Sequence, residues 1–226
     1  MKKYFNMAID GPAGAGKSTI AKEVAKRLNF IYVDTGAMYR AVGLYYINKK
    51  IDVTNEEEVN KEIDNINVEV KILDDGIKLF LNGEDVTDKI RTPEVSDSAS
   101  KVSVHKLVRE RMVAMQQEIA KKNNIVMDGR DIGTVVLPNA DLKIYLTASV
   151  EERANRRYKE YIDKGEEADL EQIKKDIEER DYRDMHRDIS PLREAEDAVH
   201  LDSTGMAIEE EISYIMDFVD SIRNEE

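Results

Sequence analysis

The sequence has no cysteine among its 226 residues, which excludes disulfide bonds and metal sites built on cysteine ligands. It also has no apolar run approaching the roughly 18 residues that a membrane-spanning helix needs. Near the N-terminus, Asp10 interrupts the one apolar stretch, so the pattern of a secretory signal peptide is missing. These absences predict a soluble protein of the cytoplasm.

Positive charge is also in short supply, because 34 Lys and Arg residues face 47 Asp and Glu residues and leave a net charge of −13. Such a balance argues against a chain built to bind bulk nucleic acid or an anionic membrane surface. Any anion site must therefore be assembled locally, from selected arginines, lysines and helix N-termini. With 226 residues, 41% of them apolar, and no internal repeat, the chain suits one globular domain with insertions or two small domains. We expect a monomer.

Glycine is sparse, with 11 residues in the chain, but three glycines gather in the short stretch from Gly11 to Gly16. This stretch and its continuation fit the pattern G-x-x-x-x-G-K-[ST] of phosphate-binding loops, and a glycine-rich turn without a ligand is the simpler alternative. Glycines let the backbone wrap around an anion, and the following helix adds its positive N-terminal end. The motif predicts that ATP phosphates bind here, with Lys17 on the β- and γ-phosphates and the Ser18 hydroxyl on Mg²⁺. The predicted ATP-binding residues are Gly11, Pro12, Ala13, Gly14, Ala15, Gly16, Lys17, Ser18 and Thr19.

Apolar runs and helical periodicity alternate along the chain in the order expected of a parallel α/β fold. Strands over 4–9 and 30–33 flank a helix over 18–28, whose apolar residues recur at a spacing of about 3.6 residues. In such sheets ligands bind in the loops at the carboxyl ends of the strands, and the glycine-rich stretch lies in such a loop. Further strands are predicted over 125–127, 141–146 and 198–201, and further helices over 37–48 and 207–223.

The region 36–103 has a different pattern, and we interpret it as an insertion into the sheet protein. An acidic helix over 55–66 is expected to begin with Thr54 as its N-cap and Glu57 at the capping-box position. Apolar residues then alternate on both sides of an Asp-Asp-Gly turn over 68–81, which predicts an antiparallel hairpin. Two more helices are predicted over 94–102 and 104–120.

Two strongly charged helices, predicted over 150–164 and 170–187, are separated by a polar break. Neither has a wide apolar stripe, so we expect both to project from the core. Arginine recognises phosphate groups in a bidentate manner, and paired charged helices suit a lid that closes over phosphates. A solvated surface laced with salt bridges is the alternative, because both helices also carry many acidic residues. The arginines concerned are Arg153, Arg156, Arg157, Arg180, Arg183 and Arg187.

Acidic and basic residues follow two of the predicted strands. In Asp128-Gly129-Arg130-Asp131, Asp128 is a candidate to reach Mg²⁺ through a water, and a tight turn with exposed charges is the alternative. Asp34-Thr35-Gly36 is either part of the site or a helix start with Thr35 as N-cap. The three histidines, His105, His186 and His200, have no metal-ligand spacing, and we expect His200 to be structural.

In these stretches the sequence resembles the bacterial cytidylate kinases, nucleoside monophosphate kinases that have a phosphate-binding loop. The resemblance is collinear over nearly the whole chain, and it is most specific in 34–40, read DTGAMYR, and in 128–136, read DGRDIGTVV. Further matching segments are Asp10–Thr19, Gly83–Val86, Ile90-Arg91, Ser98–Ser100, Val108–Glu110, Glu179–Asp181, Arg183-Asp184 and Leu201–Thr204.

The resemblance implies a kinase core with a parallel sheet flanked by helices, a helical lid, and an inserted nucleotide-acceptor region with a small antiparallel sheet. We accordingly expect one domain over 1–226. Its predicted parts are a core of 1–35, 104–150 and 191–226, an insert of 36–103 and a lid of 151–190.

The resemblance also implies transfer of a phosphoryl group from Mg·ATP to CMP or dCMP, with site residues carried over position by position. The residues matching Ser100, Arg109 and Asp131 read the cytosine, whose amino group donates to a carboxylate. The acceptor phosphate is held by Arg40, Arg130 and Arg187, the sugar by Arg180 and Asp184, and the acceptor site is lined by Thr35 and Tyr39. The residues implied to act on the transferred group are Lys17, Arg130, Arg187, Arg157 and Arg153.

One departure concerns the metal. Many members of the family read Gly-Lys-Gly-Thr where this chain reads Gly-Lys-Ser-Thr, so the Mg²⁺ hydroxyl is either Ser18, which the general motif favours, or Thr19. Two other functions stay open: a kinase for another small acceptor, such as UMP, a different nucleoside monophosphate or a hydroxy acid, and a GTP-binding switch. The absence of an Asn-Lys-x-Asp sequence, which would read guanine, disfavours the switch.

Overall fold

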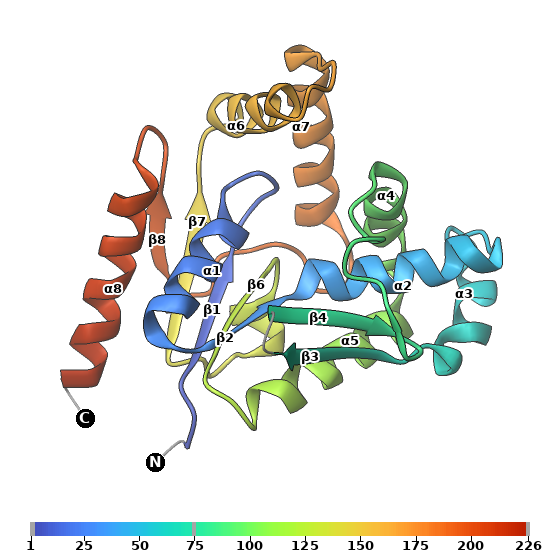
Figure 1. Cartoon of the computed structure of the whole chain (residues 1–226), viewed down its shortest axis with the longest axis horizontal. Coiled ribbons are helices and arrows are strands. Elements are labelled where there is room, and N and C mark those ends of the chain that lie inside the picture. Colours follow the sequence, from blue (N-terminus) through green and yellow to red (C-terminus); the bar gives the residue numbers. More distant parts are fainter. Residues whose placement is uncertain (1–2, 74–75, 225–226) are drawn as a thin grey trace. The chain divides into compact units, whose positions relative to one another are not determined.

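The computed structural model describes residues 3–73 and 76–224. The chain folds into two compact units, of which the first comprises Met1–Tyr32 and Lys122–Glu226 and the second comprises Val33–Lys121 (Figure 1). Among the described residues, no helix is both long enough and apolar enough to cross a membrane. We describe each unit by itself, and the finer division into core, insert and lid stays a prediction.

A five-stranded sheet organises the first unit, with the strand order β2-β6-β1-β7-β8. β1 runs parallel to both β6 and β7, and β7 runs parallel to β8. In this register Asp10 lies opposite Gly129 and Tyr145, so the carboxyl ends of β1, β6 and β7 meet at one edge. The predicted α/β class is confirmed. The strands are β1 (Asn6–Asp10), β2 (Ile31–Asp34), β6 (Ile125–Gly129), β7 (Leu142–Thr147) and β8 (Val199–Asp202).

Two helices, α1 (Lys17–Leu28) and α8 (Ile208–Asn224), pack against each other and form one core with the sheet (Figure 1). The alternating strand residues Met7 and Ile9 are fully buried there, as expected when every second side chain faces the helices. The helices contribute residues at the predicted helical spacing. These are Ile20, Ala21, Val24 and Ala25 from α1 and Ile212, Ile215 and Val219 from α8.

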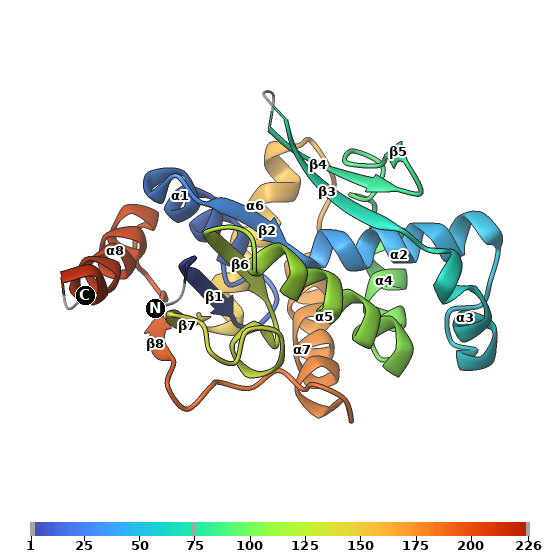
Figure 2. The same cartoon turned by 90° about the horizontal axis from the view of Figure 1, so that it is seen from below.

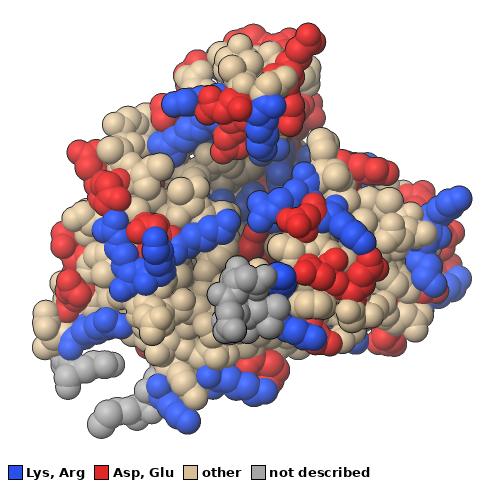
Figure 3. All heavy atoms as spheres, viewed as in Figure 1, with Lys and Arg blue, Asp and Glu red and all other residues tan. Residues whose placement is uncertain are grey.

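The two charged helices are α6 (Val150–Asp163) and α7 (Leu170–His186). Ser149 caps the first and Asp169 caps the second, each accepting from backbone N–H groups of the first turn. They pack on each other through a small apolar cluster of Ala154, Ile173 and Ile177. Elsewhere both helices are polar, and acidic and basic side chains are interspersed over α6 at the top of Figure 3.

The second unit is built around α2 (Thr35–Lys49). This helix packs against α4 (Pro93–Val102) and lies beside β3 and β4 (Figure 2). Gly43 permits the close approach of α4, because a Cβ at that position would lie 2.9 Å from the backbone nitrogen of Ala99. The remaining elements are α3 (Glu56–Glu62), a 3₁₀ turn η1 (Ile63–Asn65), β3 (Val68–Leu73), β4 (Gly76–Leu81), β5 (Glu84–Asp85) and α5 (Lys106–Ala120).

The predicted hairpin is confirmed as the antiparallel pair β3–β4, and β5 adds a third short strand that periodicity did not predict. Two residues of the predicted turn, Asp74 and Asp75, lie outside the described residues. The N-cap assignments were wrong. α3 is capped by Asn55, whereas Thr54 donates to Asp52, and α2 is capped by Asp34 rather than by Thr35. In each helix the N-cap is the residue that has an extended backbone and a side-chain oxygen within reach of the N–H groups of the first turn.

Candidate functional site

The loop between β1 and α1 has the backbone that the glycine motif predicts. Gly14 and Gly16 have positive φ angles of 76° and 88°, which only glycine adopts without strain. At Gly11 a Cβ would lie 1.9 Å from the carbonyl oxygen of Leu146, so no larger residue fits. Gly16 is the N-cap of α1 and offers no side chain to the first helical N–H groups. These groups are therefore available to an anion at the positive end of the helix.

Lys17 is buried at the start of α1, where its Nζ donates a 2.6 Å hydrogen bond to the carbonyl of Pro12. Burial and the neighbouring guanidinium groups of Arg130 and Arg180 lower the pKa of Lys17 well below its usual value. An ammonium group in this position is stabilised by an added anion, because the anion offsets both effects. The side chain is thus suited to bind phosphate oxygens.

Ser18 and Asp128 lie next to each other. The Ser18 hydroxyl donates to Oδ2 of Asp128 over 2.7 Å, and the Tyr32 hydroxyl donates to Oδ1 over 2.9 Å. Asp128 is the fourth residue of β6, and the parallel register brings the end of this strand beside the end of β1 and the loop that follows it. A hydroxyl and a carboxylate oxygen at this distance fit Mg²⁺, which takes few protein ligands when phosphates supply the others.

The described residues contain no group of three or more His, Cys, Asp or Glu side chains that could hold a metal ion by themselves. A divalent ion at Ser18 and Asp128 would therefore take its remaining ligands from water and from phosphates. His200 lies on β8 with an exposed side chain that contacts Glu194 over 2.9 Å, so it is a surface residue and not part of the core.

Asp10, at the end of β1, shapes the loop after β6. Its two carboxylate oxygens accept hydrogen bonds from the backbone N–H groups of Ile132 and Gly133, over 2.8 and 2.7 Å. Burial raises the pKa of Asp10 to about 6, even though both of these hydrogen bonds lower it. The segment that follows, Ile132–Val136, forms a π-helical turn that sequence periodicity did not predict. This arrangement fixes the backbone on the C-terminal side of Arg130 and Asp131.

Arg130 and Asp184 form a largely buried ion pair, with Nε of the arginine 2.8 Å from Oδ2 of the carboxylate. Burial opposes the charge of Asp184, but Arg130 and Arg180 hold the pKa of its carboxyl group below the usual value. The contact joins α7 to the loop after β6. It orients one guanidinium group in the neighbourhood of Lys17.

The side chains of Asp131 and Arg187 are each only 7% exposed, and the guanidinium Nη2 lies 3.5 Å from Oδ1 of Asp131. Nε of Arg187 donates to the carbonyl of Ser190 over 2.6 Å, which fixes the guanidinium group just after the end of α7. The sequence predicted each of these residues, and the structure brings Asp128, Arg130, Asp131, Asp184 and Arg187 together around one loop.

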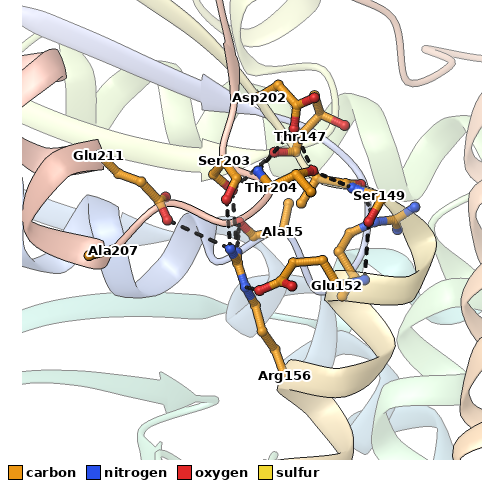
Figure 4. Close-up of polar contacts among 12 residues, drawn as sticks. Ala15, Thr147, Ser149, Glu152, Arg156, Asp202, Ser203, Thr204, Ala207 and Glu211 are labelled. Carbon is orange, nitrogen blue, oxygen red and sulfur yellow. Dashed lines mark hydrogen bonds and ion pairs between the residues drawn. The ribbon is translucent and has the colours of Figure 1, made fainter.

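The arginines of α6 have different surroundings. Arg157 is half-buried and stacks against Tyr161, with the guanidinium carbon 5.6 Å from the ring centroid. Arg153 is buried and donates to the carbonyls of Ala13 and Ala148. Arg156 donates to the carbonyls of Ser203 and Ala15 and lies 3.8 Å from the buried carboxylate of Glu211 (Figure 4).

The second unit holds the other predicted residues. Arg40 pairs with Asp34 over 2.9 Å, and Gly36 leaves room for this contact. Arg109 on α5 is buried, donates to the carbonyl of Ser103, and lies over the ring of Tyr39. Thr35 is buried in the first turn of α2, and Ser100 is half-buried on α4. α4 and α5 both pack against α2, which carries Thr35, Tyr39 and Arg40.

The sequence patterns predict no role for Asp10, Tyr32 or Asp181. Asp10 was visible as an acid that ends an apolar strand immediately before the glycine motif, which is an unusual place for a charge. Tyr32 and Asp181 gave no such signal, because their partners Asp128 and Ala13 lie far away along the chain.

Comparisons with known proteins agree on one family. A family model described as cytidylate kinase matches residues 7–221. The cytidylate kinase of Bacillus cereus (strain B4264) is 50% identical over 222 residues, which cover 98% of this chain and 99% of the relative. The cytidylate kinase of Bacillus thuringiensis (strain Al Hakam) is similar to the same extent.

A solved structure shows a similar fold at low sequence identity. The crystal structure of an uncharacterized protein from Eubacterium ventriosum ATCC 27560 aligns with a TM-score of 0.56 and 12% identity, covering 96% of this chain and 99% of that chain. Because the sequence identity is so low, this structural similarity supports a shared fold and says nothing about function.

Proposed function

This chain belongs to the cytidylate kinase family, and we propose that it transfers the γ-phosphoryl group of ATP to CMP and dCMP, giving CDP and dCDP. The observation that carries the proposal is 50% identity to cytidylate kinases over 98% of the chain. The resemblance noted along nearly the whole sequence is thus matched by relatives that cover the residues of both units. We also propose that the enzyme acts as a monomer in the cytoplasm.

For the donor, we propose that the glycine loop and Lys17 bind the phosphates of ATP. The glycine φ angles and the start of α1 at Lys17 support this assignment, because together they direct N–H groups and one ammonium group toward an anion. Transfer of a phosphoryl group depends mainly on positioning and on neutralising charge. A buried lysine supplies both.

For the metal, we propose that Ser18 is a direct ligand of Mg²⁺ and that Asp128 is reached through a water. The 2.7 Å contact between these side chains supports Ser18 over Thr19. Mg²⁺ held by these two side chains would neutralise charge that develops on the phosphates during transfer. The hydroxyl of Tyr32 holds the other oxygen of Asp128, so the carboxylate has one fixed orientation.

For the acceptor phosphate, we propose Arg40, Arg130 and Arg187, as the resemblance to the family implies. Acidic partners fix two of these guanidinium groups: Asp184 orients Arg130, and Asp34 orients Arg40. No side chain has to act as a nucleophile, because the acceptor phosphate is an oxyanion at neutral pH. The arginines offset the repulsion between donor and acceptor, and Arg157 on α6 would neutralise the transferred group.

For the base and sugar, we propose that Ser100, Arg109 and Asp131 bind the cytosine and that Arg180 and Asp184 bind the sugar, as the resemblance to the family implies. Thr35 and Tyr39 would line the acceptor site. A carboxylate accepts from the amino group of cytosine, whereas uracil presents a carbonyl oxygen at the same position. A buried polar group left unpaired costs about 1–3 kcal/mol, so we expect CMP to be preferred over UMP at least tenfold.

The test is an assay of ATP consumption with a panel of acceptors: CMP, dCMP, UMP, AMP, GMP and shikimate. We expect CMP and dCMP to give by far the highest kcat/KM. Turnover of shikimate or AMP with no reaction of CMP would instead support a kinase of another acceptor. Binding of GTP with no phosphorylation of any acceptor would support a switch.

A further inference from the structure

Arg153 occupies an unusual position for an arginine of a charged helix. It lies in the first turn of α6, it is only 4% exposed, and its Nε donates to the carbonyl of Ala148 over 2.9 Å. Its Nη1 donates both to the carbonyl of Ala13 over 2.8 Å and to Oδ2 of Asp181 over 2.6 Å. The side chain thus reaches the middle of the glycine loop.

Asp181 completes the arrangement from α7. Its carboxylate is buried, and its second oxygen, Oδ1, accepts the backbone N–H of Ala13 over 3.2 Å. Both backbone groups of Ala13 are therefore held by one ion pair. The guanidinium group of Arg153 donates to the carbonyl of Ala13, and the carboxylate of Asp181 accepts from its N–H. The two charged groups neutralise each other.

The glycine loop needs such support. Gly11, Gly14 and Gly16 give its backbone the freedom to curl around phosphates, and the same freedom opposes any single arrangement of its N–H groups. A loop that is already held in the binding geometry loses less entropy when its ligand arrives. Ala13 lies between Gly11 and Gly14, so a clamp on this residue restrains the whole turn.

We propose that Arg153 and Asp181 are a positioning pair that holds the glycine loop in its phosphate-binding geometry and ties α6 and α7 to that loop. The pair acts through Ala13 and touches no substrate. This role replaces the direct contact with the transferred group that the family resemblance implied for Arg153. The inference rests on the proposed use of ATP as donor.

Replacing both Arg153 and Asp181 distinguishes a pair that positions the loop from a pair that only stabilises the fold. Removing one partner of a buried pair leaves a buried charge alone and destabilises the fold, whereas replacing both partners with apolar residues restores much of the stability. If the pair serves only stability, the binding of ATP should recover together with the melting temperature. If the pair positions the loop, the melting temperature recovers and the binding of ATP does not.

The experiment compares Arg153→Met, Asp181→Leu and the double variant in the full-length chain, by thermal melting, by the KM for ATP and for CMP, and by calorimetric binding of ATP. In the double variant we expect a melting temperature closer to that of the parent than in either single variant. We also expect a KM and Kd for ATP raised at least tenfold, with the KM for CMP changed less than threefold. Asp181→Asn keeps the size of the side chain and one oxygen that can accept from the N–H of Ala13, so it should raise the KM for ATP less than the double variant does. Because it leaves the charge of Arg153 unpaired, its melting temperature should fall below that of the parent.

Lys174→Met is the matched control. Lys174 also joins α7 to α6, through a 2.7 Å contact with Glu151, but no contact of this pair involves the glycine loop. We expect its KM for ATP to equal that of the parent. A KM for ATP within twofold of the parent in both the double variant and Asp181→Asn would overturn the inference. The proposed function would fail separately, through a parent enzyme that does not phosphorylate CMP.

Discussion

The hydroxyl of Ser18 donates a 2.7 Å hydrogen bond to the carboxylate of Asp128, and this contact joins the start of α1 to the end of β6. Because Tyr32 binds the other carboxylate oxygen, Asp128 has a fixed orientation toward the glycine loop. The pairing distinguishes Ser18 from the adjacent hydroxyl of Thr19, which the motif alone did not do.

The first prediction concerns Mg²⁺. Ser18→Ala should raise the Mg²⁺ concentration needed for half-maximal activity at least tenfold, because Ser18 is proposed as one of the few protein ligands of the metal. Thr19→Val should leave that concentration within twofold of the parent. The measurement is a titration of initial rate against free Mg²⁺ at saturating ATP and CMP. The opposite ranking of the two variants would assign the metal to Thr19.

Lys17→Ala should lower kcat by roughly 10²–10³, because Lys17 is proposed to supply a cation where charge develops during transfer. The melting temperature should be recorded alongside, since Lys17 is buried. Lys26→Ala changes an exposed lysine of the same helix and should have no effect on kcat. A kcat of Lys17→Ala within tenfold of the parent would exclude the proposed role.

Arg130→Ala should also lower kcat severely, by roughly 10² or more, because Arg130 is proposed to hold the acceptor phosphate. It should destabilise the protein as well, since Asp184 would be left without its buried partner. Assays therefore belong well below the melting temperature of the variant. Arg27→Ala removes an arginine whose partner Glu209 is exposed, and this control should keep the parent kcat.

The cluster in Figure 4 predicts how stability depends on pH. Burial raises the pKa of Glu211 from 4.5 to about 7, with Arg156 lowering it and Glu152 raising it further. The folded state therefore favours the protonated carboxyl group. The contribution of the Glu211 carboxyl group to the stability of the fold is fully present below pH 4.5 and is lost as the pH rises through 7.

Glu211→Gln should consequently gain stability relative to the parent as the pH rises from 5 to 8, by about 3 kcal/mol at most, because one pKa unit corresponds to about 1.4 kcal/mol. Urea unfolding at several pH values measures the difference. Glu209→Gln changes an exposed glutamate in the same first turn of α8, and its difference in stability from the parent should not change with pH. A difference between Glu211→Gln and the parent that does not change with pH would contradict the assignment.

Periodicity predicted most of the fold, because the strands and core helices are specified by local apolar patterns that burial then satisfies. It did not resolve the choice between neighbouring caps. Thr54 and Asn55 are both good N-caps, and only the extended backbone of Asn55 and its reach to Glu57 and Glu58 decided between them.

Motifs predicted the residues around the glycine loop, but not the contacts that orient them. Asp10 acts on Ile132 and Gly133, and Asp181 acts on Ala13, across separations of more than a hundred residues. Such contacts depend on the register of parallel strands and on the packing of α6 against α7, which no local pattern encodes. The same reason explains why Arg153 was grouped with Arg157, although the two arginines have different partners.

The most direct test of the central claim is the ratio of kcat/KM for CMP to kcat/KM for UMP, measured with the parent enzyme and ATP. We predict a ratio of at least ten, because Asp131 is proposed to accept a hydrogen bond that the amino group of cytosine can donate and the carbonyl oxygen of uracil cannot. A ratio near one would contradict this reading of Asp131, and the absence of any CDP would contradict the function itself.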